Sequence, residues 1–260
     1  KMVLFQFPKY FNLIWVQRFL INFRFVWVFV NVIFWTIILC IVGMLVSLFE
    51  WRGKFLSWVA QTWSKLILAI SGLKYRVIGL GNLDPTGHYV FAANHESALD
   101  IPLAFGGLPF HVVSIAKIEL KRIPIFGWAM MAGGHFFVDR TRHKKAFNSL
   151  DKAKESMAKN PRSIIIFPEG TRSINGEVKP FKKGGLIMAL QMGIPVVPIA
   201  LCGTRNALGK NGLALHRQSL ELRIGKPINT QKINYEDRHQ FVKNVRKEVI
   251  ALKEMWHDSA

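Results

Sequence analysis

An uncharged apolar run from Phe25 to Phe49 constrains this chain more than any other feature of its sequence. Its 25 residues are enough to cross the hydrocarbon of a bilayer as one helix. Basic residues lie on both sides of the run, so the positive-inside rule selects no orientation. We therefore expect either a tilted span or a helical hairpin that enters one leaflet and returns, with Asn31 or Gly43 as the breaking point. A cleavable signal peptide is not expected, because the apolar core is too long and no small-residue cleavage site follows it.

A second helical pattern follows at residues 55–70, where Trp58 and Trp63 recur among aliphatic residues at helical spacing. Such a helix is amphipathic, and tryptophan favours the membrane interface. Two placements are open: the helix lies along the lipid headgroups, or it packs on a soluble domain. We assign residues 1–71 to N-terminal membrane-anchoring helices and residues 72–260 to a separate domain.

Beyond Gly72 short apolar runs alternate with helical patterns. Seven runs are predicted strands: KYRVIGL (74–80), HYVFAA (88–93), FHVVSIA (110–116), HFFVD (135–139), SIIIF (163–167), IPVVPIAL (194–201) and LELRIG (220–225). Helices are predicted over 141–159, with Ala146, Leu150, Ala153 and Met157 on one stripe, and over 235–256, with Phe241, Val242, Val245, Val249 and Leu252 buried. This alternation predicts an α/β fold, in which a largely parallel sheet is flanked by helices and preceded by a membrane-embedded helical segment.

The formal net charge is +19, which predicts attraction to anionic lipid, phosphorylated ligands, acidic carrier proteins or nucleic acid. Nucleic acid is disfavoured because no recognition motif accompanies the charge. With two cysteines, a disulfide framework has no support. A metal site is not expected either, since His95, His111 and His135 belong to different predicted elements.

The stretch AANHESALD places His95 and Asp100 five residues apart. On one helix these side chains would point roughly 140° apart, so a simple helical pair is excluded. If the strand ends near residue 93 and a helix begins near Ser97, the two converge, either as a catalytic pair or as a satisfied polar turn. Ser97 lacks a G-x-S-x-G elbow and is interpreted as a helix cap.

Two further stretches follow predicted strands. FPEGTRS (167–173) combines a flexible Gly170 backbone with the hydroxyl of Thr171 and the guanidinium of Arg172, a set suited to phosphate. The alternative is a turn in which Glu169 and Arg172 pair with each other. In SIAKIELKRIPIFGW (114–128), Lys117 is notable only for its position after a strand, because a basic cluster is usually a solvated face.

Together, NHESALD, AKIELKRIPIFGW, FPEGTRS and VVPIAL (196–201) resemble the four sequence blocks of the 1-acylglycerol-3-phosphate acyltransferases, within the glycerolipid acyltransferase superfamily. Their order and spacing also fit, from Tyr75 to Leu201. The resemblance implies transfer of a fatty acyl group from a thioester of acyl carrier protein or coenzyme A to the 2-hydroxyl of lysophosphatidic acid, giving phosphatidic acid. Neither a cofactor nor a metal is expected.

The resemblance and the residue chemistry imply a role for each candidate. His95 is the general base for the hydroxyl, and Asp100 fixes its tautomer. Lys117 and Arg172 hold the acceptor's phosphate, and Glu169 either orients Arg172 or contacts the glycerol. Backbone amides near Gly170 are candidates for stabilising the oxyanion.

Two other functions remain open. One is an acyltransferase with another acceptor, such as glycerol 3-phosphate. The other is a basic, non-enzymatic protein that binds anionic lipid. The expected partners are membrane lipid, the thioester carrier and an anionic bilayer surface. The expected location is a bacterial inner membrane, with the catalytic domain at its cytoplasmic face.

Overall fold

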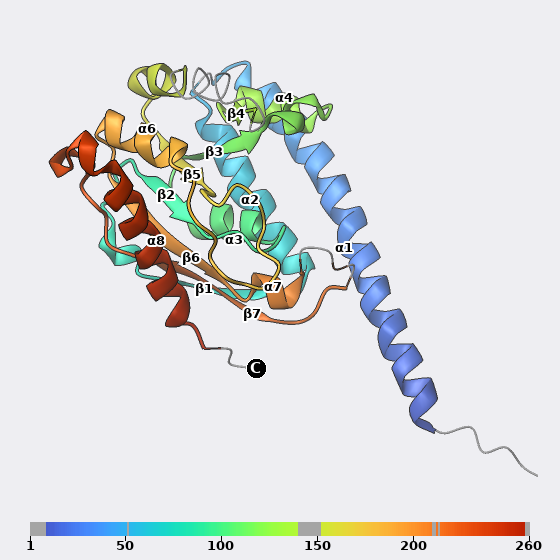
Figure 1. Cartoon of the computed structure of the whole chain (residues 1–260). Helices are drawn as coiled ribbons and strands as arrows, with labels where there is room; N and C mark the ends of the chain where they lie inside the picture. The colour runs from blue at the N-terminus through green and yellow to red at the C-terminus, as the bar shows by residue number, and fades with distance from the viewer. Residues whose placement is uncertain (1–8, 51, 140–151, 210–211, 213, 258–260) are drawn as a thin grey trace, which may run out of the picture.

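The computed structural model describes residues 9–50, 52–139, 152–209, 212 and 214–257. They form a seven-stranded sheet covered by helices on both faces, with a long N-terminal helix along one side (Figure 1). The strands are β1 (Lys74–Ile78), β2 (Val90–Ala93), β3 (Val112–Lys117), β4 (Phe136–Val138), β5 (Ser163–Ile166), β6 (Val196–Cys202) and β7 (Ser219–Ile224). Each of them lies within or overlaps one of the seven predicted runs.

The strand order is β1-β7-β6-β2-β5-β3-β4, and every neighbouring pair is parallel except β6 and β7. Every residue of β2, β5 and β6 is buried, which explains why these strands are continuous apolar runs in the sequence. The predicted fold class, α/β with a largely parallel sheet between helices, is confirmed.

Helices divide between the two faces of the sheet. They are α1 (Lys9–Ser47), α2 (Lys54–Ile70), α3 (Asp100–Gly107), α4 (Phe126–Ala132), α6 (Gly184–Met192), α7 (Thr204–Ala207) and α8 (Arg238–Glu254), with short 3-10 turns η1 (Leu80–Asn82), η2 (Ile118–Arg122), η3 (Thr230–Lys232) and η4 (Tyr235–Asp237). Phe91 of β2 packs in the hydrophobic cluster that includes Leu68 of α2 and Leu103 of α3, whereas Val90 packs with residues of α6 and α8. Successive residues of a strand thus serve opposite layers.

The two predicted amphipathic helices are present in the described residues. Residues 152–159 are helical and bury Ala153 and Met157, while Ala146 and Leu150 lie outside the described part of the chain. α8 buries Phe241, Val242, Val245 and Val249 as predicted, and Leu252 is half-buried.

Of the two expected arrangements of the apolar run, the hairpin broken at Asn31 or Gly43 is wrong, because α1 continues without interruption through both residues. The Asn31 amide donates to the Trp27 carbonyl oxygen at 2.9 Å, one turn earlier in the same helix. Gly43 is instead a point of close helix packing, since a Cβ atom there would lie 2.4 Å from Cδ2 of Leu56 in α2. The glycine that suggested a hinge allows two helices to approach.

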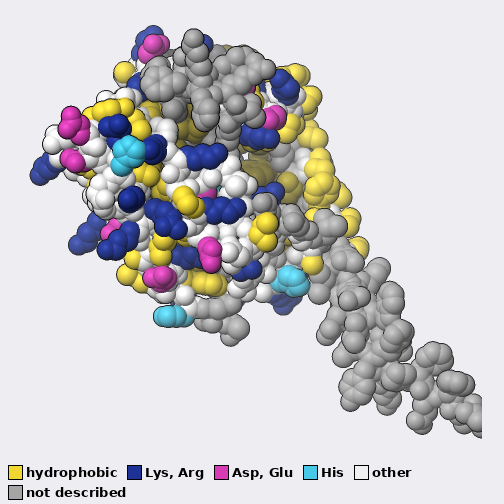
Figure 2. Space-filling model, in the orientation of Figure 1, with side chains coloured by type: hydrophobic (Ala, Val, Ile, Leu, Met, Phe, Trp, Pro, Cys, Tyr) yellow, Lys and Arg dark blue, Asp and Glu magenta, His cyan; other side chains and the backbone are white. Residues whose placement is uncertain are grey.

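α1 has protein on one side and an open apolar surface on the other. Its segment Phe23–Ser47 is long and apolar enough to cross a bilayer, and only 6% of its most apolar window is buried. Along this same length it contacts α2 and the turn after it, where the Arg24 guanidinium donates to the Ser71 carbonyl oxygen and Trp63 Nε1 donates to Thr36 Oγ1 at 3.0 Å. Figure 2 shows hydrophobic side chains along its outer edge.

α2 packs on the domain, the second of its two expected placements. It lies against α3 and buries Ile67 and Leu68, whereas Trp58 stays exposed. The predicted boundary between residues 71 and 72 stays a prediction, although the helices before it share a core with the sheet.

Candidate active site

The predicted site residues gather at one edge of the sheet. His95 follows β2, Lys117 ends β3, and residues 169–172 follow β5. Because β2 pairs in parallel with β5 and β6, and β5 with β3, the carboxyl ends of these strands meet at the same edge. This is the edge at which parallel α/β sheets bind ligands.

His95 and Asp100 form a hydrogen-bonded pair. The Nδ1 atom of His95 lies 2.7 Å from Oδ2 of Asp100, whose side chain is fully buried, whereas the imidazole is 18% exposed. The convergence arises as the sequence predicts: β2 ends at Ala93, and Asp100 opens α3. With Nδ1–H donating to a carboxylate, Nε2 is the nitrogen left to accept a proton from a substrate.

The Asp100 carboxylate is fixed from several directions. Oδ2 also accepts the backbone N–H groups of Glu96 at 2.6 Å and Ser97 at 2.8 Å. Oδ1 accepts the Thr204 hydroxyl at 2.5 Å. These bonds hold the carboxylate toward His95 before any substrate arrives, which is the preorganisation that an imidazole base requires.

Ser97 does not cap α3 as predicted, because the helix begins three residues later. Its buried hydroxyl donates to the Leu208 carbonyl oxygen at 2.6 Å and accepts the Leu99 amide at 3.2 Å. It therefore closes the turn before the helix through these two bonds.

Glu169 supports the backbone of His95 rather than pairing with Arg172. One carboxylate oxygen accepts the His95 N–H at 2.7 Å, and the other accepts the Lys179 N–H at 3.1 Å. Burial raises the pKa of Glu169, and these two bonds oppose that rise. The predicted alternative of a Glu169–Arg172 pair is therefore wrong.

Gly170 makes the tight turn after β5. Its φ of +74° favours glycine, and its N–H donates to the Phe167 carbonyl oxygen at 3.0 Å. That amide is engaged within the turn, so this geometry gives no support to its predicted role at an oxyanion. The next residue, Thr171, is exposed.

Lys117 and Arg172 line the same cavity as His95. Among the described residues the Arg172 guanidinium has no hydrogen-bond or ion-pair partner, and half-exposed Lys117 pairs with Glu119 at 3.0 Å. The cavity has a volume of about 530 Å³. Its walls are mostly apolar and come from α1 (Thr36, Leu39, Cys40), α2 (Leu56, Val59, Ala60, Trp63, Ser64), α3 and the turn before it (Ala98, Ile101, Phe105), and residues 114–135, with Phe167 beside His95.

A buried ion pair behind the catalytic turn escaped the sequence-based prediction. Glu96 accepts the Asn94 amide at 3.0 Å and the ammonium of Lys253, which also donates to the Gly176 carbonyl oxygen. Burial raises the pKa of Glu96, and Lys253 opposes the rise. The positions of Asn94 and Glu96 beside His95, and of Thr204 after β6, are sequence signals that could have identified these three residues. Nothing in the sequence marks Lys253, in the last turn of α8, as their partner.

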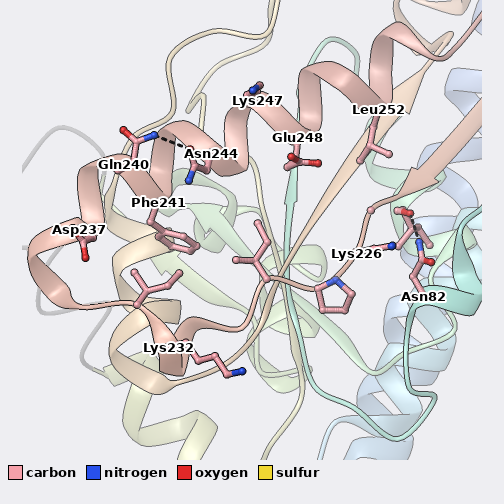
Figure 3. A pocket seen from close by; sticks show the side chains of 15 residues that line it. Asn82, Lys226, Lys232, Asp237, Gln240, Phe241, Asn244, Lys247, Glu248 and Leu252 are labelled. Atoms are coloured by element: carbon pink, nitrogen blue, oxygen red, sulfur yellow. Dashed lines mark hydrogen bonds between the residues drawn. The ribbon is translucent and has the colours of Figure 1, made fainter.

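A larger hollow, of about 950 Å³, lies at the opposite edge of the sheet. It runs between α8 and the segment after β7, where Ile228 pairs with Val196, the first residue of β6 (Figure 3). Its labelled side chains include Lys226 and Lys232 but none of the predicted site residues. The cavity at His95 is therefore the candidate active site.

Comparisons with known proteins point to one family. A family model described as Acyltransferase matches residues 74–202. A 1-acyl-sn-glycerol-3-phosphate acyltransferase of Saccharomyces cerevisiae is 34% identical over 207 residues, which cover 78% of this chain and 68% of that protein. One from Cocos nucifera is 35% identical over 60% of this chain, and the match spans about half (51%) of that protein's length.

A solved structure is also similar. The crystal structure of the 1-acyl-sn-glycerophosphate (LPA) acyltransferase PlsC from Thermotoga maritima superposes with a TM-score of 0.75 and 26% sequence identity. The match covers 94% of this chain and 99% of that one, so it includes the N-terminal helices as well as the sheet.

Proposed function

This chain belongs to the 1-acyl-sn-glycerol-3-phosphate acyltransferase family, and we propose that it transfers a fatty acyl group from a thioester to the 2-hydroxyl of lysophosphatidic acid, giving phosphatidic acid. The observation that carries the proposal is the His95–Asp100 pair at a cavity that also holds two cationic side chains and a long apolar wall. One cavity thus offers a base, a phosphate site and a place for an acyl chain.

His95 acts as the general base in this proposal. Its Nε2 takes the proton of the acceptor hydroxyl as the oxygen attacks the thioester carbonyl carbon, and Asp100 stabilises the imidazolium. The carbon–sulfur bond then breaks, and the imidazolium returns the proton to the departing thiolate. The acceptor supplies the nucleophile, so the protein needs none, in agreement with the engaged hydroxyl of Ser97.

Arg172 and Lys117 hold the acceptor's phosphate. A guanidinium that has no partner among the described residues is suited to bind a dianion through two parallel hydrogen bonds. Lys117 would exchange its exposed partner Glu119 for the phosphate, at small cost because exposed ion pairs contribute little.

The apolar part of the cavity suits a fatty acyl chain. Side chains of α1, α2 and α3 enclose it, so a chain bound there leaves water and gains roughly 0.8 kcal/mol per buried methylene. Acyl carrier protein and coenzyme A both deliver a thioester to such a cavity, and both remain donors in this proposal.

The outer face of α1 supports a membrane location. Because its inner face contacts α2 and the turn after it at positions from Arg24 to Gly43, we propose that α1 lies in one leaflet and carries the sheet beside it at the surface. The cytoplasmic face of a bacterial inner membrane is the proposed surface, since it meets both a membrane-held acceptor and a cytosolic thioester.

Thiol release tests the reaction. The full chain is supplied with palmitoyl-coenzyme A or palmitoyl-acyl carrier protein, and with lysophosphatidic acid, glycerol 3-phosphate or no acceptor. We expect release that depends on lysophosphatidic acid and yields phosphatidic acid. Faster release with glycerol 3-phosphate would overturn the acceptor assignment, and acceptor-independent binding without release would favour a lipid-binding protein.

A further inference from the structure

The apolar surface of this protein is not confined to α1. Residues 118–132, which comprise η2 and α4 and are named here the α4 segment, expose three large hydrophobic side chains. Ile123 is 45% exposed, Trp128 53% and Met131 39%. Single exposed hydrophobic residues are ordinary, but a contiguous group of them marks a contact surface.

The α4 segment is continuous with the exposed face of α1. α4 contacts α1, and the turn between α1 and α2 packs on its end, where a Cβ atom on Gly53 would lie 3.1 Å from the Gly133 carbonyl oxygen. That turn exposes Leu48 and Phe49 almost completely. In Figure 2 hydrophobic side chains continue from the region of α4 down the outer edge of α1.

The backbone of the α4 segment is tightly turned. Ile125 has a φ of +63°, and it is the only non-glycine residue with a positive φ in the part of the chain that the structure describes. For a β-branched side chain this backbone conformation is a true outlier. Gly127 packs so tightly on the turn before it that a Cβ atom would lie 2.5 Å from the Lys121 carbonyl oxygen. The segment is therefore compact.

Charge indicates what covers this surface. Lys121 and Arg122 are exposed directly beside Ile123, so cations border the apolar group. Tryptophan at such a border is typical of the zone between acyl chains and headgroups, and basic residues there attract anionic lipid. Continuity with α1 and this charged rim both favour a bilayer over a protein partner.

We propose that the α4 segment is a membrane-contacting element in addition to α1 and its following turn, with Trp128 and Met131 among the lipid chains and Lys121 and Arg122 at the headgroups. What this contact means for catalysis rests on the proposed function. Leu120, Phe126, Ala129 and Met130 of the same segment line the cavity at His95, as do Thr36, Leu39 and Cys40 of α1. Two lipid-contacting elements then line the cavity, and an acceptor held in the leaflet reaches His95 without crossing water.

Hydroxyl-radical oxidation of the full chain in vesicles of phosphatidylcholine and phosphatidylglycerol tests the contact. Met255, 57% exposed at the end of α8 on the other side of the sheet, is the internal control for Met131, and Trp27 on α1 is the control for Trp128. We expect Met131 and Trp128 to be oxidised about tenfold more slowly than Met255, as lipid-buried groups are. Oxidation of Trp128 and Met131 as fast as Met255, with Trp27 protected, overturns the proposal and leaves the α1 anchor standing. Protection that increases with the protein-to-lipid ratio would identify a second copy as the cover and also overturns it.

Activity gives an independent readout. Trp128→Ser with Met131→Ser should lower acylation of vesicle-embedded lysophosphatidic acid about fivefold, because buried apolar area sets the depth of interfacial elements. Acylation of a dispersed short-chain acceptor should not change, and Met255→Ser should affect neither. Equal losses on both acceptors would overturn the proposal. Failure of the unsubstituted chain with both acceptors would instead refute the proposed function.

Discussion

The catalytic turn and the outer face of α1 are specified in opposite ways. Around His95 the carboxylates of Glu96, Asp100 and Glu169 are buried, and each accepts a hydrogen bond from another part of the fold. The outer face of α1 carries large apolar side chains with no protein against them. The conformation of the catalytic turn depends on protein contacts, whereas the outer face of α1 depends on the medium that surrounds it. Substitutions in the catalytic turn should therefore alter turnover, and substitutions on the outer face of α1 should alter location.

The largest effect is expected at the base. His95→Ala should lower kcat by roughly 10²–10⁴-fold, the usual contribution of general-base catalysis. Asp100→Asn should also be severe, because an amide donates where the imidazole needs an acceptor. Turnover and vesicle flotation are measured on the same preparations. Near-normal turnover of folded His95→Ala contradicts the mechanism, and loss of flotation contradicts the separation of the two regions.

Lys253 should come next, although it touches no substrate. Lys253→Met leaves the Glu96 carboxylate buried without its cation, which costs about 3–5 kcal/mol in the free energy of unfolding when a buried pair is broken. Replacing both partners, as Glu96→Gln with Lys253→Met, should recover most of that loss. Thermal unfolding and kcat of the two variants measure this coupling. No recovery in the double variant would mean that Lys253 acts through its bond to the Gly176 carbonyl oxygen instead.

The stability of Lys253→Met should depend on pH in a way that a purely structural role of Lys253 would not produce. Burial raises the pKa of Glu96 above its unfolded value, so the folded state binds the proton more tightly and stability falls as pH rises through the folded pKa. Without Lys253 that pKa should rise further. The deficit against the parent chain should therefore grow from acidic toward neutral pH and shrink once Glu96 is protonated, as followed by unfolding at several pH values.

The sequence predicted the residues that line this cavity better than the residues that hold them in place. The sequence placed His95 after one predicted strand and Arg172 after another, and the family resemblance implied that the two share a site. They meet at one edge because β2 and β5 are adjacent and parallel. Glu169 looked like a partner for its neighbour Arg172, yet it turns to backbone amides because both of its oxygens find donors there. Lys253 lies far from Glu96 in the chain, and only the packing of α8 on the sheet reveals the pair.

A smaller and more selective effect is expected at the phosphate site. Arg172→Ala should raise KM for lysophosphatidic acid by about 10-fold or more while sparing the thioester, since a charge-assisted hydrogen bond contributes about 1.5–3 kcal/mol. Arg172→Lys should recover little if the guanidinium binds through two bonds. KM values for acceptor and donor are compared, with Arg205→Ala as a control at a neighbouring arginine that bonds the Ile174 carbonyl oxygen. Equal changes for acceptors with and without phosphate would indicate a structural role.

The smallest effect should come from salt acting on the outer surface. Each lysine or arginine near an anionic membrane contributes only about 1 kcal/mol, and salt screens it, whereas burial of the apolar face of α1 is insensitive to ionic strength. High salt should therefore leave the full chain on vesicles, and detergent should release it. A charge placed on the open apolar face of α1, as in Phe34→Asp, should weaken flotation. Ile78→Asp on β1 should not, although Ile78 is also exposed (40%, against 53% for Phe34). Release by salt alone would show that the +19 charge, and not the open face of α1, attaches the protein to the vesicle. The outer face of α1 would then differ from the catalytic turn in its substitutions' effect on charge, and not in its contact with an apolar medium.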